Sequence, residues 1–217
     1  MRDLLPSSVA VAVATAADFA GELHPAEHAC LPASAVESRR REFTAGRVCA
    51  RRALGTLGLP ETPVTTRDRA PVWPDGTIGS ITHTDGYCAA VVARRQDVRA
   101  LGVDAEQHRP LGEGVARLVC LPEELDWFAT APDGVHWPAV VFSAKESVYK
   151  LWHPLAGSWL GFEEARVLPD PETGAFTAVI RPQRHDEAAA HGIPTELTGR
   201  FVVEGGLVRT ALHLPAG

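Results

Sequence analysis

Residues 142–152 read Phe142-Ser143-Ala144-Lys145-Glu146-Ser147-Val148-Tyr149-Lys150-Leu151-Trp152. Both lysines of the chain lie in this stretch, and all the others among its 21 lysine and arginine residues are arginines. Lysine differs from arginine because its compact ammonium gives up a proton when the environment lowers its pKa. On a helix, Glu146 and Lys150 share a face, while Val148, Leu151 and Trp152 face broadly the other way. The pattern predicts a helix with one apolar face and one charged face.

Two structural explanations of these charges stay open beside a functional one. Ser143-x-x-Glu146 has the spacing of a capping box, in which the two side chains satisfy the first amide groups of a helix. Glu146 and Lys150 have the spacing of a surface ion pair. The stretch alone does not decide between these explanations and a catalytic role.

The composition is that of an ordinary globular protein. With 217 residues, of which 45% are hydrophobic and 22% charged, the chain can form one sizeable core or two small ones. Its net charge of −6 argues against a general nucleic-acid binder and against binding to anionic membranes. No run of apolar residues is long enough to span a membrane.

The cysteines and the N-terminus favour a cytoplasmic protein. Cys30, Cys49, Cys88 and Cys120 are widely spaced and form no metal-binding pattern, so we expect free thiols in a reducing compartment. Residues 8–17 could serve as the core of a signal peptide, but their alternation of valine and alanine favours a first strand.

The first half of the chain predicts one long helix followed by strands. The helix opens at Ser34-x-x-Glu37 and runs to Gly55 and Gly58. It carries six arginines, at positions 39, 40, 41, 47, 51 and 52, which is more than solubility needs and favours a bound polyanion. After a connection at 60–77, we expect a hairpin of strands 78–84 and 87–93 and a third strand at 100–106.

The second half again predicts helix before strand. Helical periodicity covers 113–130, with a break at Pro122, and 138–152. Strands are expected at 162–168, 175–181, 199–204 and 207–214, with a loop at 182–194. The fold class is therefore α+β, with two similar halves at 1–102 and 103–217, although no internal sequence repeat is detectable.

Three carboxylates indicate a metal site. Asp104 and Glu106 lie two apart on a predicted strand, so both point to the same face. Neighbouring carboxylates repel each other unless a cation or a proton compensates them. With Glu146, they form a set of hard oxygen donors that suits Mg²⁺, and the nearby cationic residues predict a phosphate-bearing substrate, such as a pyrophosphate.

The usual nucleotide-binding loops are absent from the sequence, which has neither G-x-x-x-x-G-K-[ST] nor G-x-G-x-x-G. Ser80, Thr82 and His83 instead offer two hydroxyls and an imidazole near the end of a strand. A single histidine in such a place has a structural explanation as well as a catalytic one.

Taken together, the motifs resemble the three signature blocks of the surfactin-type 4′-phosphopantetheinyl transferases. The blocks are Trp73-Pro74-x-Gly76 with Ser80-Ile81-Thr82-His83-Thr84, then Gly102-Val103-Asp104-Ala105-Glu106, then the stretch from Phe142 to Lys150. Their order and intervals match as well, and the arginine-rich helix is similar to that of the actinobacterial and enterobactin-type branch. The resemblance covers about residues 36–168 and, more loosely, the remainder.

This resemblance implies a pseudo-dimeric α+β monomer with the active site between two similar halves. Coenzyme A would be the substrate, and its phosphopantetheine arm would be transferred to a serine of an apo acyl or peptidyl carrier protein, releasing adenosine 3′,5′-bisphosphate. The carrier would belong to a polyketide, non-ribosomal peptide, siderophore or fatty-acid synthase. The first half would contact the phosphates of coenzyme A, and the second half would hold the metal and the catalytic helix.

The resemblance also implies residue roles. Asp104, Glu106 and Glu146 would bind Mg²⁺, or Mn²⁺ in its place, on the pyrophosphate, and Glu146 would take the proton of the carrier serine. Lys150 would stabilise or protonate the leaving phosphate. The coenzyme's phosphates would contact, besides Asp104 and Lys150, the following residues: Arg39, Arg47, Ser80, Thr82, His83 and Lys145. Either Arg67 or Arg69 would replace a lysine found in many relatives.

Two other functions use the same residues. A metal-dependent phosphohydrolase of nucleotide-like diphosphates would need the same carboxylates, with water as the nucleophile. A non-catalytic module that binds coenzyme A or a carrier protein would need only the cationic residues.

Overall fold

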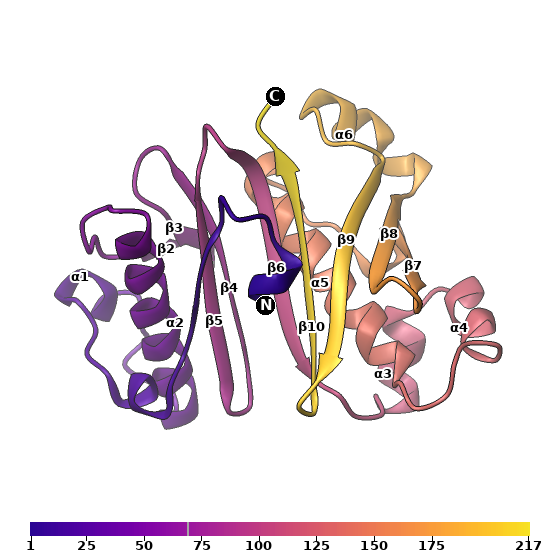
Figure 1. Cartoon of the computed structure of the whole chain (residues 1–217), viewed down its shortest axis with the longest axis horizontal. Coiled ribbons are helices and arrows are strands. Elements are labelled where there is room, and N and C mark those ends of the chain that lie inside the picture. Colours follow the sequence, from indigo (N-terminus) through magenta and orange to yellow (C-terminus); the bar gives the residue numbers. More distant parts are fainter. Residues whose placement is uncertain (69) are drawn as a thin grey trace. The chain divides into compact units, whose positions relative to one another are not determined.

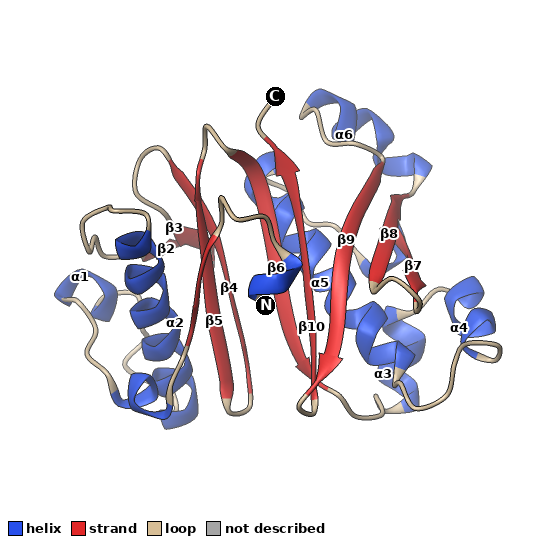
Figure 2. Ribbon diagram, in the orientation of Figure 1, coloured by secondary structure: helices blue, strands red, loops and turns tan. Residues whose placement is uncertain are grey.

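The computed structural model describes residues 1–68 and 70–217, so the predicted contact through Arg69 lies outside the described residues. The chain divides into two compact units, one of Met1–Leu101 with Leu214–Gly217 and one of Gly102–His213 (Figure 1). The last residues belong to the first unit, where the Ala216 amide donates to the Asp97 carbonyl at 3.3 Å. Both units combine helices with antiparallel strands, which confirms the α+β class (Figure 2).

The first unit contains a three-stranded antiparallel sheet in the order β1-β5-β4. Its strands are β1 (Ala10–Val13), β4 (Thr77–Thr84) and β5 (Tyr87–Arg94), and a separate pair consists of β2 (Thr65–Arg67) and β3 (Ala70–Val72). The helices are η1 (Arg2–Leu4), η2 (Ala16–Ala20), α1 (Pro25–His28) and α2 (Glu37–Thr56). The predicted hairpin of β4 and β5 is confirmed, with Thr84 paired to Tyr87.

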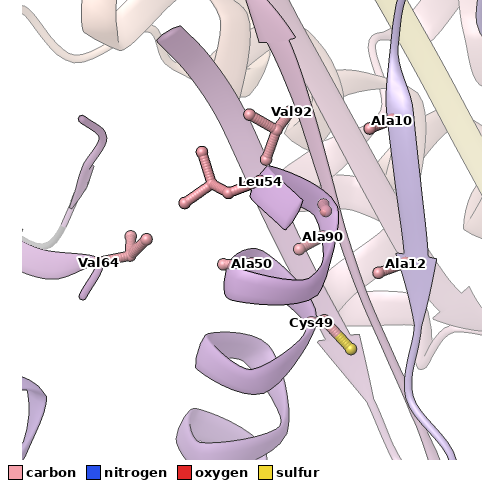
Figure 3. Packing of buried hydrophobic residues seen from close by; sticks show 9 residues of the cluster. Ala10, Ala12, Cys49, Ala50, Leu54, Val64, Ala90 and Val92 are labelled. Carbon is pink, nitrogen blue, oxygen red and sulfur yellow. The ribbon is translucent and has the colours of Figure 1, made fainter. Parts of the chain in front are cut away.

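The core of this unit lies between α2 and the sheet. Ala50 and Leu54 of α2 are completely buried and pack with Ala90 and Val92 of β5 (Figure 3). The strands present small side chains to the helix, and small residues allow close packing of backbone on backbone. Trp73 lies over Gly79, where any Cβ would be 2.5 Å from the indole ring.

The second unit is built on a five-stranded antiparallel sheet in the order β6-β10-β9-β8-β7. The strands are β6 (Val98–Gln107), β7 (Ala165–Asp170), β8 (Ala175–Ile180), β9 (Glu196–Glu204) and β10 (Leu207–Pro215). The helices are α3 (Glu113–Val119), α4 (Pro122–Phe128), α5 (Trp137–Ala156), η3 (Phe162–Glu164), η4 (Pro182–Arg184) and α6 (His185–Ala190). The predicted break at Pro122 is confirmed, because Pro122 begins α4.

A buried glutamate joins three elements of the first unit. Glu27 occupies the third position of α1 and is completely buried. Its carboxylate accepts from the amides of His24 at 2.9 Å and Val64 at 3.0 Å, and it pairs with the guanidinium of Arg51 on α2. The glutamate thus caps a short helix, holds the chain just before β2 and pairs with the long helix.

The second unit repeats this arrangement with other residues. Glu124, at the third position of α4, accepts from the amides of Leu121 at 2.7 Å and Val167 at 2.6 Å and from the ammonium of Lys145 on α5 at 2.8 Å. Both glutamates stand in an x-Pro-x-Glu pattern, at 24–27 and 121–124, although the same pattern also occurs at 193–196. The two units are therefore similar in a way that the sequence did not reveal.

Four details of the sequence interpretation are wrong. Ser34 does not cap α2, which begins after Val36, and Ser143 does not cap α5, which begins two turns earlier after His136. The loop expected at 182–194 contains η4 and α6, and the connection at 60–77 contains β2 and β3. Among the described residues, no helix is long and apolar enough to cross a membrane.

Candidate active site

Helix α5 presents the charged stretch of the sequence beside β6. Its apolar face is completely buried, including Val148 and Leu151, as the periodicity predicts. The helix ends at Gly157, whose φ of 69° is a left-handed conformation that favours glycine. Glu146 and Lys150 lie one turn apart on α5 and keep part of their surface exposed.

Asp104 connects β6 to this helix. It is 4% exposed, and its two oxygens accept from different residues of α5. Lys150 Nζ lies 2.7 Å from Oδ1, and Ser143 Oγ donates to Oδ2 at 2.8 Å. Lys150 therefore pairs with Asp104, and the interpretation of Glu146 and Lys150 as an isolated surface ion pair is wrong.

The other two carboxylates lie within electrostatic reach of Asp104. Burial, followed by the charges of Asp104 and Glu146, raises the pKa of Glu106 to about 7 against the opposing effect of Lys150. Burial and the charge of Asp104 also raise the pKa of Glu146. Three carboxylates and one lysine thus occupy a single region of the second unit, where added positive charge would be stabilising.

These carboxylates do not form a ready-made metal cage. Within the described residues, no three His, Cys, Asp or Glu side chains converge closely enough to hold an ion by themselves. Mg²⁺ is usually held by one or two carboxylates together with water and substrate phosphates. The donor set fits such a shared site, because it supplies hard oxygens with excess negative charge.

Lys145 does not belong to this group. Its side chain is 2% exposed, and its ammonium donates to the Val119 carbonyl at 2.8 Å, to Glu124 Oε2 at 2.8 Å and to the Phe162 carbonyl at 2.9 Å. An ammonium has three N–H groups, so all of them are used within the protein. The expectation that Lys145 holds a phosphate oxygen is wrong: it is a buried structural residue.

In the first unit, the structure brings Arg39 and His83 together. Arg39 Nη1 lies 3.0 Å from His83 Nε2, and His83 Nδ1 lies 3.5 Å from Glu42 Oε2. Because arginine can only donate, Nε2 accepts and Nδ1 carries the hydrogen that faces Glu42. Ser80 and Thr82 alternate with His83 along β4, so they lie on its other face, and both are buried.

Arg47 occupies a buried position one turn further along α2 from Phe43. It is 6% exposed, its Nη2 donates to Thr66 Oγ1 at 2.7 Å, and its guanidinium lies 4.1 Å from the Phe43 ring centre. Burial lowers the pKa of Arg47 to about 10. Its Nε is buried without a hydrogen-bond partner among the described residues, which indicates that the cation is not fully satisfied by the protein.

Three of the other four arginines of α2 are explained by contacts within the unit, and the fourth, Arg41, is exposed. Arg51 pairs with Glu27, Arg52 Nη2 lies 2.5 Å from Asp18 Oδ1, and Arg40 donates to the carbonyls of Ala33 and Ala35. The helix is therefore less available to a polyanion than its composition indicates.

Arg67 is exposed at the end of β2.

Comparisons with known proteins decide the family. Residues 26–93 match the model of the 4′-phosphopantetheinyl transferase N-terminal domain, and residues 100–200 match that of the 4′-phosphopantetheinyl transferase superfamily. The chain is 45% identical to the 4′-phosphopantetheinyl transferase Svp of Streptomyces mobaraensis, over 88% of this chain and 79% of that protein. The chain belongs to the 4′-phosphopantetheinyl transferase superfamily.

Other relatives agree. The chain is 45% identical to PptT of Mycobacterium tuberculosis, over 87% of this chain and 85% of that protein. It is 40% identical to Npt of Nocardia iowensis, over 87% of this chain and 88% of that protein. Both relatives are named 4′-phosphopantetheinyl transferases. The resemblance stated from the motifs is confirmed. The protein is thus an enzyme that transfers phosphopantetheine from coenzyme A to carrier proteins.

Several residues around the phosphopantetheinyl transferase site could not be found from the motifs. Ser143 lies inside the third motif, but its contact with Asp104 depends on a fold that joins residues 39 positions apart. Thr210 and Glu124 lie outside all three motifs and contact Ser143 and Lys145. For Glu124, the x-Pro-x-Glu pattern was the available signal.

Proposed function

We propose that the enzyme carries out a Mg²⁺-dependent transfer in which Asp104, Glu106 and Glu146 hold the metal against the pyrophosphate of coenzyme A. The observation that supports this proposal is that burial, together with the charge of Asp104, raises the pKa of both Glu106 and Glu146. Carboxylates that destabilise one another favour a divalent cation. When bound, Mg²⁺ would neutralise the charge that develops on the phosphates during transfer.

The carrier serine needs a base, because a hydroxyl is a weak nucleophile. Glu146 is assigned that role because it is a carboxylate on the partly exposed face of α5, and Glu is among the side chains that act as general bases. Lys150, whose side chain is 26% exposed, is held by Asp104 and is assigned to the phosphate that leaves with adenosine. Transfer of a proton from Lys150 to that oxygen would complete the reaction.

Arg39, His83 and Arg47 are assigned to the phosphates of coenzyme A. Arg39 and His83 already contact each other, so both can approach the same anion. Arg47 is a buried cation with an unsatisfied Nε, and a phosphate near its guanidinium would compensate the cost of burial. Arg67 is kept as the candidate for the position at which many relatives have lysine.

Helix α3 is proposed as part of the docking surface for the carrier protein. Leu118 and Val115 are 72% and 48% exposed, and Arg117 lies between them in sequence. Exposed apolar side chains flanked by charge are typical of protein interaction sites. We expect Leu118→Asp and Arg117→Glu to raise the KM for the carrier and to leave the KM for coenzyme A unchanged. If neither variant changes the carrier KM, this surface is not the docking site.

One assay tests the chemistry. Apo carrier protein is incubated with coenzyme A and Mg²⁺, and the carrier is weighed by mass spectrometry with and without a chelator. A gain equal to phosphopantetheine that disappears with the chelator supports the proposal. Cleavage of coenzyme A without carrier modification would support a phosphohydrolase, and the absence of turnover would support a binding module.

A further inference from the structure

Four buried side chains form a continuous chain of oxygen atoms that ends at Asp104. Ser147 Oγ lies 2.6 Å from Thr210 Oγ1, Thr210 Oγ1 lies 3.0 Å from Ser143 Oγ, and Ser143 Oγ lies 2.8 Å from Asp104 Oδ2. Ser143, Ser147 and Thr210 are completely buried. The chain joins α5, β10 and β6, which are three elements of the second unit.

The hydrogens of this chain are ordered by chemistry. A carboxylate can only accept, so the single hydrogen of Ser143 points to Asp104. The hydrogen of Thr210 therefore points to Ser143, where the carbonyl lies 2.9 Å away and the hydroxyl 3.0 Å away. The hydrogen of Ser147 in turn points to Thr210. The hydrogens of Ser147 and Ser143 thus point along the chain toward Asp104, and the single hydrogen of Thr210 lies between the carbonyl and the hydroxyl of Ser143.

We propose that Thr210 is a positioning residue for Asp104, an inference that rests on the proposed metal centre. The Ser143 side chain can adopt several rotamers, and in the observed one Oγ donates to Asp104 Oδ2. Thr210 holds Ser143 in that rotamer, because its hydroxyl is bonded on one side and is itself held by Ser147 on the other. The second oxygen of Asp104 accepts from Lys150, so the carboxylate is fixed through both oxygens.

A purely structural role of the same hydroxyls leads to a different expectation. If Thr210 only satisfied buried polar groups, its loss would lower the free energy of unfolding and leave metal affinity unchanged. If it positions Asp104, metal affinity falls as well. Loss of an outer partner of a metal ligand typically costs about 10- to 100-fold in affinity.

The test measures Mn²⁺ binding by electron paramagnetic resonance on protein saturated with coenzyme A, with no carrier present and therefore no turnover. Thr210→Val keeps the shape and removes the hydroxyl, Thr210→Ser keeps the hydroxyl, and Thr198→Val is a matched control at an exposed position of β9. Of these three variants, we expect Thr210→Val alone to weaken Mn²⁺ binding, by about 10-fold, the lower end for loss of a direct partner of a metal ligand, because Thr210 acts through Ser143. Equal affinity in Thr210→Val and wild type, or equal loss in Thr210→Ser, would overturn the inference.

Two further variants keep the test decisive. Ser143→Ala removes the bond to Asp104 directly and is expected to weaken Mn²⁺ binding at least as much as Thr210→Val. If Thr210→Val folds poorly, Ser143→Ala still tests the chain of hydroxyls. Asp104→Ala reports on the centre itself. If wild type and Asp104→Ala bind Mn²⁺ equally, the proposed centre fails. If only Asp104→Ala binds less, the centre stands and the role of Thr210 fails.

Discussion

The Gly102 backbone of β6 lies directly against the Ser147 carbonyl of α5, where a Cβ on residue 102 would be 2.0 Å from that oxygen. No side chain fits this contact, since real Cβ atoms do not approach backbone so closely. The glycine two residues before Asp104 therefore sets the distance between the strand and the helix that carry the candidate carboxylates.

Gly102→Ala should push α5 away from β6 and separate Asp104 from Lys150. Overpacking of this kind costs about 1–3 kcal/mol of unfolding free energy, which urea unfolding measures, and we expect transferase activity to fall as well. Gly55→Ala on α2 is the control, because nothing lies within 4 Å of its Cβ position. Equal stability of Gly102→Ala and wild type would contradict this account of the contact.

The two lysines of α5 should respond differently to replacement by methionine. Lys145→Met leaves the carboxylate of Glu124 buried without its cation, and breaking a buried pair in this way costs about 3–5 kcal/mol. The double variant Lys145→Met with Glu124→Gln should recover part of that loss. Lys150→Met should lower kcat with a smaller effect on stability. Thermal unfolding and kcat together distinguish the structural role of Lys145 from the catalytic role of Lys150. A Lys145→Met variant that is stable but inactive would contradict the structural role of Lys145.

The sequence predicts which faces carry the carboxylates and Lys150, because alternation on a strand and the one-turn spacing on a helix determine which side chains share a face. It misleads at Lys145, whose partner Glu124 lies 21 residues away on another helix. It also misleads at Arg51 and Arg52, which pair with Glu27 and Asp18 through tertiary contacts. A local pattern indicates the face of a side chain and leaves its partner unknown.

Cys120 should react slowly with alkylating reagents in the native enzyme. Burial, together with the charge of Glu124, raises the pKa of its thiol to about 12. Only the thiolate reacts, and at pH 8 a thiol with that pKa is ionised to about one part in ten thousand. Its labelling should therefore keep rising with pH beyond 9, where an ordinary thiol would level off. Mass mapping after iodoacetamide treatment measures this, with half-buried Cys30 as the internal comparison.

Glu146→Gln should nearly abolish turnover while the fold is retained. Glutamine keeps the size of the side chain but cannot take the proton of the carrier serine, and a general base contributes about 10²- to 10⁴-fold to rate. Coenzyme A binding, followed by calorimetry, should change far less than kcat. In Asp104→Ala, by contrast, the Mg²⁺ concentration needed for half-maximal rate should rise first. Rates like those of the wild type in both variants would refute the assigned roles.

Two arginines of α2 allow a matched test of the coenzyme A contacts. Arg39 lies beside His83, whereas Arg52 is engaged by Asp18. A charge-assisted hydrogen bond is worth about 1.5–3 kcal/mol, so Arg39→Gln should raise the KM for coenzyme A about 10- to 100-fold. Arg52→Gln removes the same charge from the same helix but leaves buried Asp18 without its cation, so it should lower stability and leave the KM unaffected. If both variants raised the KM for coenzyme A equally, the weaker binding would reflect the summed positive charge of the helix rather than a phosphate contact at Arg39.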